Sequence, residues 1–164
     1  MQIEPHVLVV SNHWGAKAFT PSVGIFVDRQ IVSLEKVGVR VDTFDIGTSH
    51  SPIHLVKRWL ELRRVVRRLN PDLVHAQYGT IVGFLSAFVS KPVVISYCGN
   101  DLQAGASVSM IRMCLGIVLS NLAALRARAL VCKSAGLQQQ LWWCRSRAVV
   151  IPSGIDLELF SPGP

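Results

Sequence analysis

Short apolar runs alternate with stretches of helical periodicity along the whole chain. The runs are rich in β-branched residues and nearly continuous, as in parallel strands that are covered on both faces. They predict strands at residues 6–10, 39–44, 92–96, 129–132 and 148–151, with a further strand that begins at residue 73. Segments with apolar residues at every third or fourth position predict helices at residues 24–37, 53–69, 79–89, 107–128 and 134–143. This alternation predicts an α/β fold, a doubly wound, mainly parallel, Rossmann-like sheet of about six strands.

The composition narrows the class of protein. The 164 residues suffice for one domain with a buried core, and half of them are hydrophobic, which excludes a disordered chain. The formal net charge of +7 favours an anionic partner, which is a lipid headgroup, a phosphorylated substrate or a nucleic acid. The four cysteines form no CxxC or zinc pattern, so we expect reduced thiols in a cytosolic setting. The most apolar segment, residues 108–125, contains Arg112 and Asn121 and falls short of the ~20 apolar residues that a membrane span needs.

Polar side chains follow the third predicted strand at once. His75, Gln77 and Tyr78 come at its carboxyl end, just before Gly79 turns the chain into the next helix. The loop at residues 97–102 follows the fourth strand in the same way. Because ligands of open α/β sheets bind at the carboxyl ends of the strands, the sequence predicts a binding site at this edge.

Five short motifs support a family resemblance. The most specific is residues 151–162, which fit the pattern P-N-G-V-D-x-x-x-F-x-P with Ser153 in place of the asparagine. The other four motifs are residues 71–79 (P-D-L-V-H-A-Q-Y-G), residues 24–27 with Gln30, residues 99–102 (G-N-D-L) and residues 127–134. In this order they resemble the amino-terminal domain of a glycosyltransferase family 4 enzyme of the two-domain GT-B type.

The resemblance implies a function. It implies the acceptor-binding half of an enzyme that transfers a hexose, with retention, from a nucleotide-sugar to a glycan or lipid-linked acceptor. In the family a second domain with an E-x7-E motif holds the nucleotide-sugar, so we expect residues 1–164 to be the acceptor-side domain alone and to be inactive by themselves. Two positions depart from the family pattern: Cys98 stands where many members have a histidine, and Gln77 replaces the second histidine of H-A-H.

The resemblance also suggests binding residues, each of which has an ordinary structural alternative. Backbone N–H groups at a helix start neutralise phosphate without a metal or cofactor, which makes Gly24 a candidate, although a tight turn explains this glycine equally well. Asn100 and Asp101, beside Gly99, are candidates for sugar hydroxyls or for capping the next helix. His75, next to Tyr78, either contacts the acceptor or is a buried histidine satisfied by the backbone.

Two further candidates lie in the loop after the first strand. His13 and Trp14 either stack on a sugar ring or form an ordinary exposed loop.

The second predicted helix is strongly basic on one side. Between Lys57 and Arg68 it carries six Lys or Arg residues and one Glu. We predict that Lys57, Arg64 and Arg68 face an anionic membrane surface, with the alternative that this side is only solvated. RNA is a weaker option, because no aromatic platform accompanies the charges.

Three hypotheses remain open at this point. The chain is the acceptor-binding half of a transferase, or a non-catalytic subunit that recruits a donor-binding chain to the inner face of a membrane, or a Rossmann-like ligand-binding module. The third is disfavoured because no GxGxxG follows the first strand.

Overall fold

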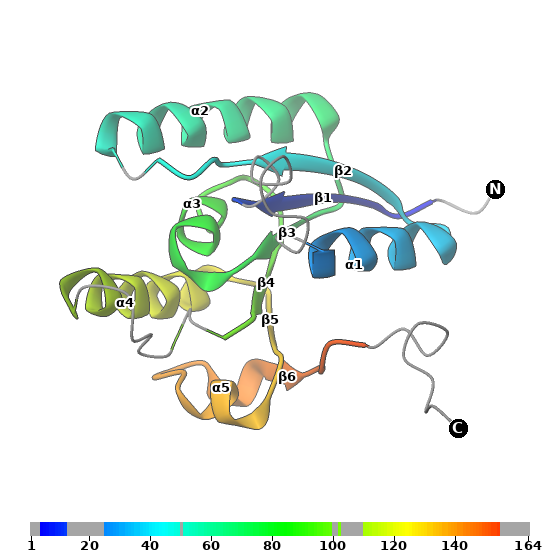
Figure 1. The fold of residues 1–164 in the computed structure, drawn as a ribbon. Helices are drawn as coiled ribbons and strands as arrows, with labels where there is room; N and C mark the ends of the chain where they lie inside the picture. Colours follow the sequence, from blue (N-terminus) through cyan, green and yellow to red (C-terminus); the bar gives the residue numbers. More distant parts are fainter. Residues whose placement is uncertain (1–3, 13–24, 50, 100–101, 103–109, 155–164) are drawn as a thin grey trace, which may run out of the picture.

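The protein forms a single six-stranded sheet in which every neighbouring pair of strands is parallel (Figure 1). This computed structural model describes residues 4–12, 25–49, 51–99, 102 and 110–154. The strands are β1 (His6–Ser11), β2 (Arg40–Asp45), β3 (Leu73–Gln77), β4 (Val93–Tyr97), β5 (Ala129–Cys132) and β6 (Ala148–Val150). Their order is β2-β1-β3-β4-β5-β6, which confirms the predicted fold class and all six predicted strands.

Helices connect the strands, and three of them match the predicted segments. The helices are α1 (Ile25–Lys36), α2 (Pro52–Leu69), α3 (Phe84–Ser86), α4 (Met110–Arg126) and α5 (Ala135–Gln139). The predicted helix starts at Gly24 and residue 107 lie outside the described residues.

Two predicted helices are much shorter in the structure. Residues 79–89 form a π-helical turn, Gly79–Gly83, and the single turn of α3, because Thr80 has a non-helical ψ of −121°. Residues 134–143 are helical only over α5, which Ser134 caps by accepting a hydrogen bond from the Leu137 N–H. Beyond it the Trp142 N–H donates to the Asn121 side chain of α4, at 2.8 Å, instead of continuing the helix.

The helices divide unequally between the two faces of the sheet. The β1-to-β2 connection runs in one direction along the sheet and the later connections run in the other. Since crossovers between parallel strands are right-handed, α1 packs on one face and α2 to α5 on the other (Figure 1). The large core, which includes Leu8, Ile95 and Tyr97, lies under α2 to α5, whereas a small cluster of Val7, Val9 and Val27 lies under α1.

Helix α2 begins and ends where the sequence predicts. Pro52 stands at its first turn, and Asn70 ends it in the left-handed conformation, with φ 48°, by donating its N–H to the Val66 carbonyl. Leu62 and Val66 are fully buried, as the predicted apolar face requires.

One basic residue of α2 does not lie on the predicted basic side. Arg58 turns toward the sheet, where it contacts the Asp45 carbonyl, Glu61 and the Phe44 ring, whose centroid is 4.6 Å from the guanidinium carbon. Its aliphatic stem and planar head pack on the aromatic ring, which explains why it leaves the solvated side.

Candidate functional site

The strand order places the topological switch point of the sheet at the carboxyl ends of β1 and β3, the position at which open α/β sheets bind ligands. The connections leave β1 and β3 toward opposite sides of the sheet, so no connecting helix covers the edge between these two strands. Ser11 and Asn12 lie at this end of β1, and Gln77 and Tyr78 at this end of β3. The Tyr78 N–H donates to the Ser96 carbonyl at 3.0 Å, which ties this edge to β4.

A buried polar network lies behind this edge, on the α1 face of the sheet. The Nε2 atom of His75 is 2.8 Å from the Ser96 hydroxyl and 3.4 Å from the Gln77 amide nitrogen. The same amide nitrogen donates to the Gln30 side-chain oxygen of α1 at 3.0 Å. These hydrogen bonds join the strands β3 and β4 to the helix α1. Each of these polar side chains would be costly to bury if it had no hydrogen-bond partner.

The charge state of His75 follows from its surroundings. Burial, and secondarily the nearby Lys133 ammonium, lower the pKa of His75 from 6.5 to about 4. The imidazole is therefore neutral at neutral pH. Both Ser96 and Gln77 can donate to Nε2 when it is unprotonated, so the geometry favours the tautomer with its proton on Nδ1.

The backbone at this edge is unusually constrained. Tyr78 has a φ of 84°, a region that non-glycine residues rarely adopt, and Gly99 after β4 has a φ of 153°. Gly79 packs so closely on the Tyr97 ring that a Cβ atom there would overlap it. Tyr97 in turn donates its hydroxyl to the Ser120 carbonyl of α4 at 2.9 Å. The position of Tyr78 is thus fixed by the packing of Gly79 after it and by the hydrogen bond of its own N–H to Ser96.

Two more polar groups lie at this edge. The Asn12 side-chain oxygen is inaccessible to solvent and has no hydrogen-bond partner among the described residues. Cys98 is half-buried after β4 and donates weakly from Sγ to the Ser96 carbonyl at 3.7 Å.

The structure brings some of the predicted site residues together and leaves others undescribed. His75, Tyr78 and Gly99 come from β3 and the end of β4, which are neighbours in the sheet. His13, Trp14, Gly24, Asn100 and Asp101 lie outside the described residues.

Sequence reasoning missed two members of this region, Ser96 and Lys133. Ser96 could have been identified from the sequence, because it is a polar residue within an apolar strand, as His75 is. Lys133, which follows β5 directly, carried no local signal, because its effect on His75 depends on the strand order.

The described part of the chain shows neither a metal-ligand cluster nor a membrane-spanning helix. Within it, no three His, Cys, Asp or Glu side chains gather in a way that could hold a metal ion. Over the same residues, no helix has the length and apolarity required to cross a membrane.

Solved structures share this fold. MnaA of S. aureus, solved with UDP, superposes with a TM-score of 0.65 at 12% identity over 89% of this chain and 43% of that protein. The UDP-GlcNAc 2-epimerase of Methanocaldococcus jannaschii gives 0.61 at 14% identity, over 90% of this chain and 45% of the other. The UDP-N-acetylglucosamine 2-epimerase of Rickettsia bellii gives a TM-score of 0.54 at 12% identity, over 85% of this chain and 41% of the other. At these identities the likeness concerns the fold, and the chain spans less than half the length of each protein.

Sequence comparison identifies the family. No curated protein matches the chain in sequence. The sequence model of Glycosyltransferase Family 4, however, matches residues 3–159, nearly the whole chain. Together with the parallel sheet and the polar edge at β1 and β3, this match shows that the chain belongs to glycosyltransferase family 4.

Proposed function

We propose that this chain is the acceptor-binding half of a glycosyltransferase, which moves a sugar from a nucleotide-sugar to a glycan or lipid-linked acceptor. The observation that carries the proposal is the polar, backbone-constrained edge at β1 and β3 in a chain of this family. Asn12, Tyr78 and the backbone at Gly99 hold the acceptor, and the nucleotide-sugar is held by a separate domain. Transfer of a hexose with retention is what the family resemblance favours.

Positioning is the main chemical task of such a half-site. Sugar transfer depends on an acceptor hydroxyl held in line with the reacting carbon, and well-oriented reactants gain a large part of the rate from this alone. The His75–Ser96–Gln77 network suits this task, because it fixes β3 against β4 directly behind Tyr78. The neutral His75 keeps the network free of a buried charge.

A binding measurement tests the role of the edge. We expect lipid-linked saccharides extracted from membranes to bind the chain in calorimetry, and Asn12→Ala to weaken binding about fivefold, because an amide that bonds a hydroxyl contributes on the order of 1 kcal/mol. Gln139→Ala, which removes an exposed amide on α5, is the matched control and leaves binding unchanged. Equal binding by both variants would reject the acceptor site.

A turnover measurement tests the division of labour. The chain alone, given a panel of nucleotide-sugars and the same lipid extract, is expected to give no transfer, since donor binding is assigned to another domain. Clear turnover by residues 1–164 would contradict the assignment.

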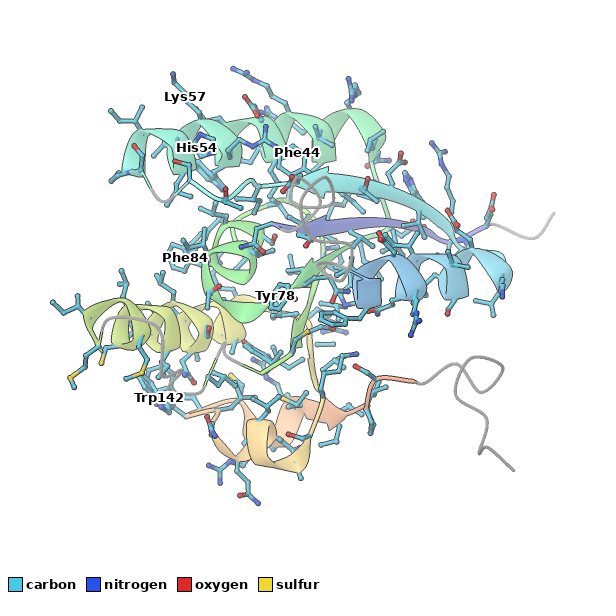
Figure 2. All side chains as sticks on the ribbon, in the orientation of Figure 1. Phe44, His54, Lys57, Tyr78, Phe84 and Trp142 are labelled. Carbon is cyan, nitrogen blue, oxygen red and sulfur yellow. The ribbon has the colours of Figure 1, made fainter. Side chains whose placement is uncertain are left out.

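A second candidate role, recruitment to a membrane, rests on the outer side of α2. Five basic residues are exposed there: Lys57, Arg63, Arg64, Arg67 and Arg68. Lys57 points away from the body of the protein (Figure 2). The one acid of this helix, Glu61, is paired with the inward-turned Arg58. An uncompensated basic surface of this kind suits the anionic face of a bilayer and is compatible with a lipid-linked acceptor or with a non-catalytic recruiting subunit.

A further inference from the structure

The outer side of α4 carries a row of exposed aliphatic residues. Five of its exposed residues are large and aliphatic, and each is between 38% and 82% exposed. They are Ile111, Leu115, Val118, Leu122 and Leu125, which we call the α4 stripe. Contiguous exposed apolar surface of this kind is typical of a contact with another molecule.

The inner side of α4 is apolar too. Ala123 and Ala124 are buried in the large core. A helix that is apolar on both sides is normally buried on both sides, whereas here only one side is covered. Arg126, in the last turn of α4, is exposed beside the stripe, where it donates to the Ala87 carbonyl at 3.2 Å and lies 4.9 Å from the centre of the Phe88 ring.

The spacing of the stripe suits another helix as its occupant. Its members follow one another at intervals of four, three, four and three residues. This spacing lets a second helix pack along the stripe with knobs in holes. A bilayer imposes no such spacing, and the basic residues that suit a bilayer lie on a different helix, α2.

We propose that the α4 stripe pairs two copies of this chain through an antiparallel α4–α4 contact. The stripe is nearly symmetric about Val118, since Ile111 and Leu125 are equally distant from it in sequence. In the antiparallel pair Val118 meets Val118 of the second copy, Leu115 meets its Leu122, and Ile111 meets its Leu125. Such a two-fold contact is self-complementary, and it sets helix ends of opposite partial charge next to one another.

Two tryptophans enlarge the contact surface. The Trp142 backbone is held to Asn121 of α4, and the rings of Trp142 and Trp143 meet edge to face with centroids 5.4 Å apart. Both side chains are more than half exposed. A stable interface buries about 800 Å² on each partner, which exceeds what a stripe of two heptads supplies, so the tryptophans provide area that the pairing needs.

Sedimentation of the purified chain across micromolar to millimolar concentrations tests the proposal. We expect a reversible dimer, and we expect the double variant Leu115→Glu with Leu122→Glu to weaken it at least a hundredfold while its circular dichroism stays that of the parent. Leu60→Glu is the control, because this leucine of α2 is as exposed as Leu122, at 41% against 40%. A parent chain that stays monomeric, or a Leu60→Glu variant that dissociates equally, overturns the proposal.

Cross-linking tests the orientation independently. In a background where the exposed Cys114 is replaced by serine, Val118→Cys is expected to form a covalent dimer on oxidation, because the two-fold axis passes beside it. Ile111→Cys alone is expected to form none, and the combination of Ile111→Cys with Leu125→Cys is expected to restore it. Efficient linking by Ile111→Cys alone contradicts the antiparallel contact. If the parent chain is monomeric and the variant Leu115→Glu with Leu122→Glu loses binding to vesicles, the stripe contacts lipid and not a second copy.

Discussion

The two faces of the sheet are built from the same strands but hold different chemistry. On β3, Val74 and Ala76 point into the large core beneath α2 to α5, whereas the alternating residues His75 and Gln77 bond to Ser96 and to Gln30 of α1. Among the residues that the structure describes, α2 to α5 cover the first face and α1 covers the second over β1 and its neighbours. The difference shows that alternate side chains of one strand can have separate roles. Those on one face stabilise the core, and those on the other support the candidate site.

The largest expected effect breaks the apolar face. Leu62 is fully buried beneath α2, so Leu62→Glu places a carboxylate in the core and is expected to cost at least about 4 kcal/mol of unfolding free energy. Leu60→Glu, two residues away on the exposed side, is expected to change it by less than about 0.5 kcal/mol. Urea denaturation of the two variants measures both, and equal losses would mean that α2 packs in another orientation.

The next effect concerns the polar face and depends on pH. Above pH 6.5 His75 is neutral in both states; below it the unfolded chain gains a proton that the folded chain, with its His75 pKa near 4, refuses. The unfolding free energy therefore falls as the pH drops from about 6.5 to about 4, by at most roughly 3 kcal/mol from this residue. His75→Gln is expected to remove this contribution in denaturation curves recorded across that range.

Lys133→Met sharpens the same measurement. Burial is the larger cause of the low His75 pKa and the Lys133 ammonium the smaller, so this variant is expected to reduce the pH dependence without abolishing it. If the unfolding free energy of His75→Gln falls as steeply with decreasing pH as that of the parent, the network does not hold a neutral histidine.

The smallest effect on folding is expected outside both faces, on the basic surface of α2. Arg64→Glu with Arg68→Glu is expected to leave stability within about 0.5 kcal/mol of the parent and to abolish binding to anionic vesicles. Each lysine or arginine near such a surface contributes on the order of 1 kcal/mol, so parent binding should be weak and should vanish at high salt. Arg29→Glu with Lys36→Glu makes the same charge change on α1 and serves as the control. Unchanged pelleting of the α2 variant would leave that surface merely solvated.

Much of the fold could be predicted from the sequence, because local patterns carry it. The β-branched runs indicated all six strands, and Asn70 with the proline after it marked the end of α2. The two shortened helices could not be predicted from periodicity, since the non-helical backbone of Thr80 and the hydrogen bond from the Trp142 N–H to Asn121 are tertiary effects. The inward turn of Arg58 has the same cause, a contact with Phe44 from a distant strand.

Less of the candidate site could be predicted. His75 and Tyr78 were identifiable because they follow an apolar run, but the pairing of His75 with Ser96 depends on β3 and β4 being neighbours. The influence of Lys133 on His75 also requires the strand order, as does the switch point between β1 and β3.

The acceptor role of the edge is tested most directly by mapping where a saccharide binds. Amide spectra of the ¹⁵N-labelled chain, recorded with lipid-linked saccharides and separately with nucleotide-sugars, report the location of each ligand. We expect the saccharides to shift the amides of Asn12, Tyr78 and Gly99, and to leave those of Asp72 and Arg128, at the opposite ends of the strands, unchanged. Nucleotide-sugars alone should shift none of the three. Saccharide shifts confined to Asp72 and Arg128, or shifts of Tyr78 and Gly99 by nucleotide-sugar alone, would contradict the acceptor-binding assignment.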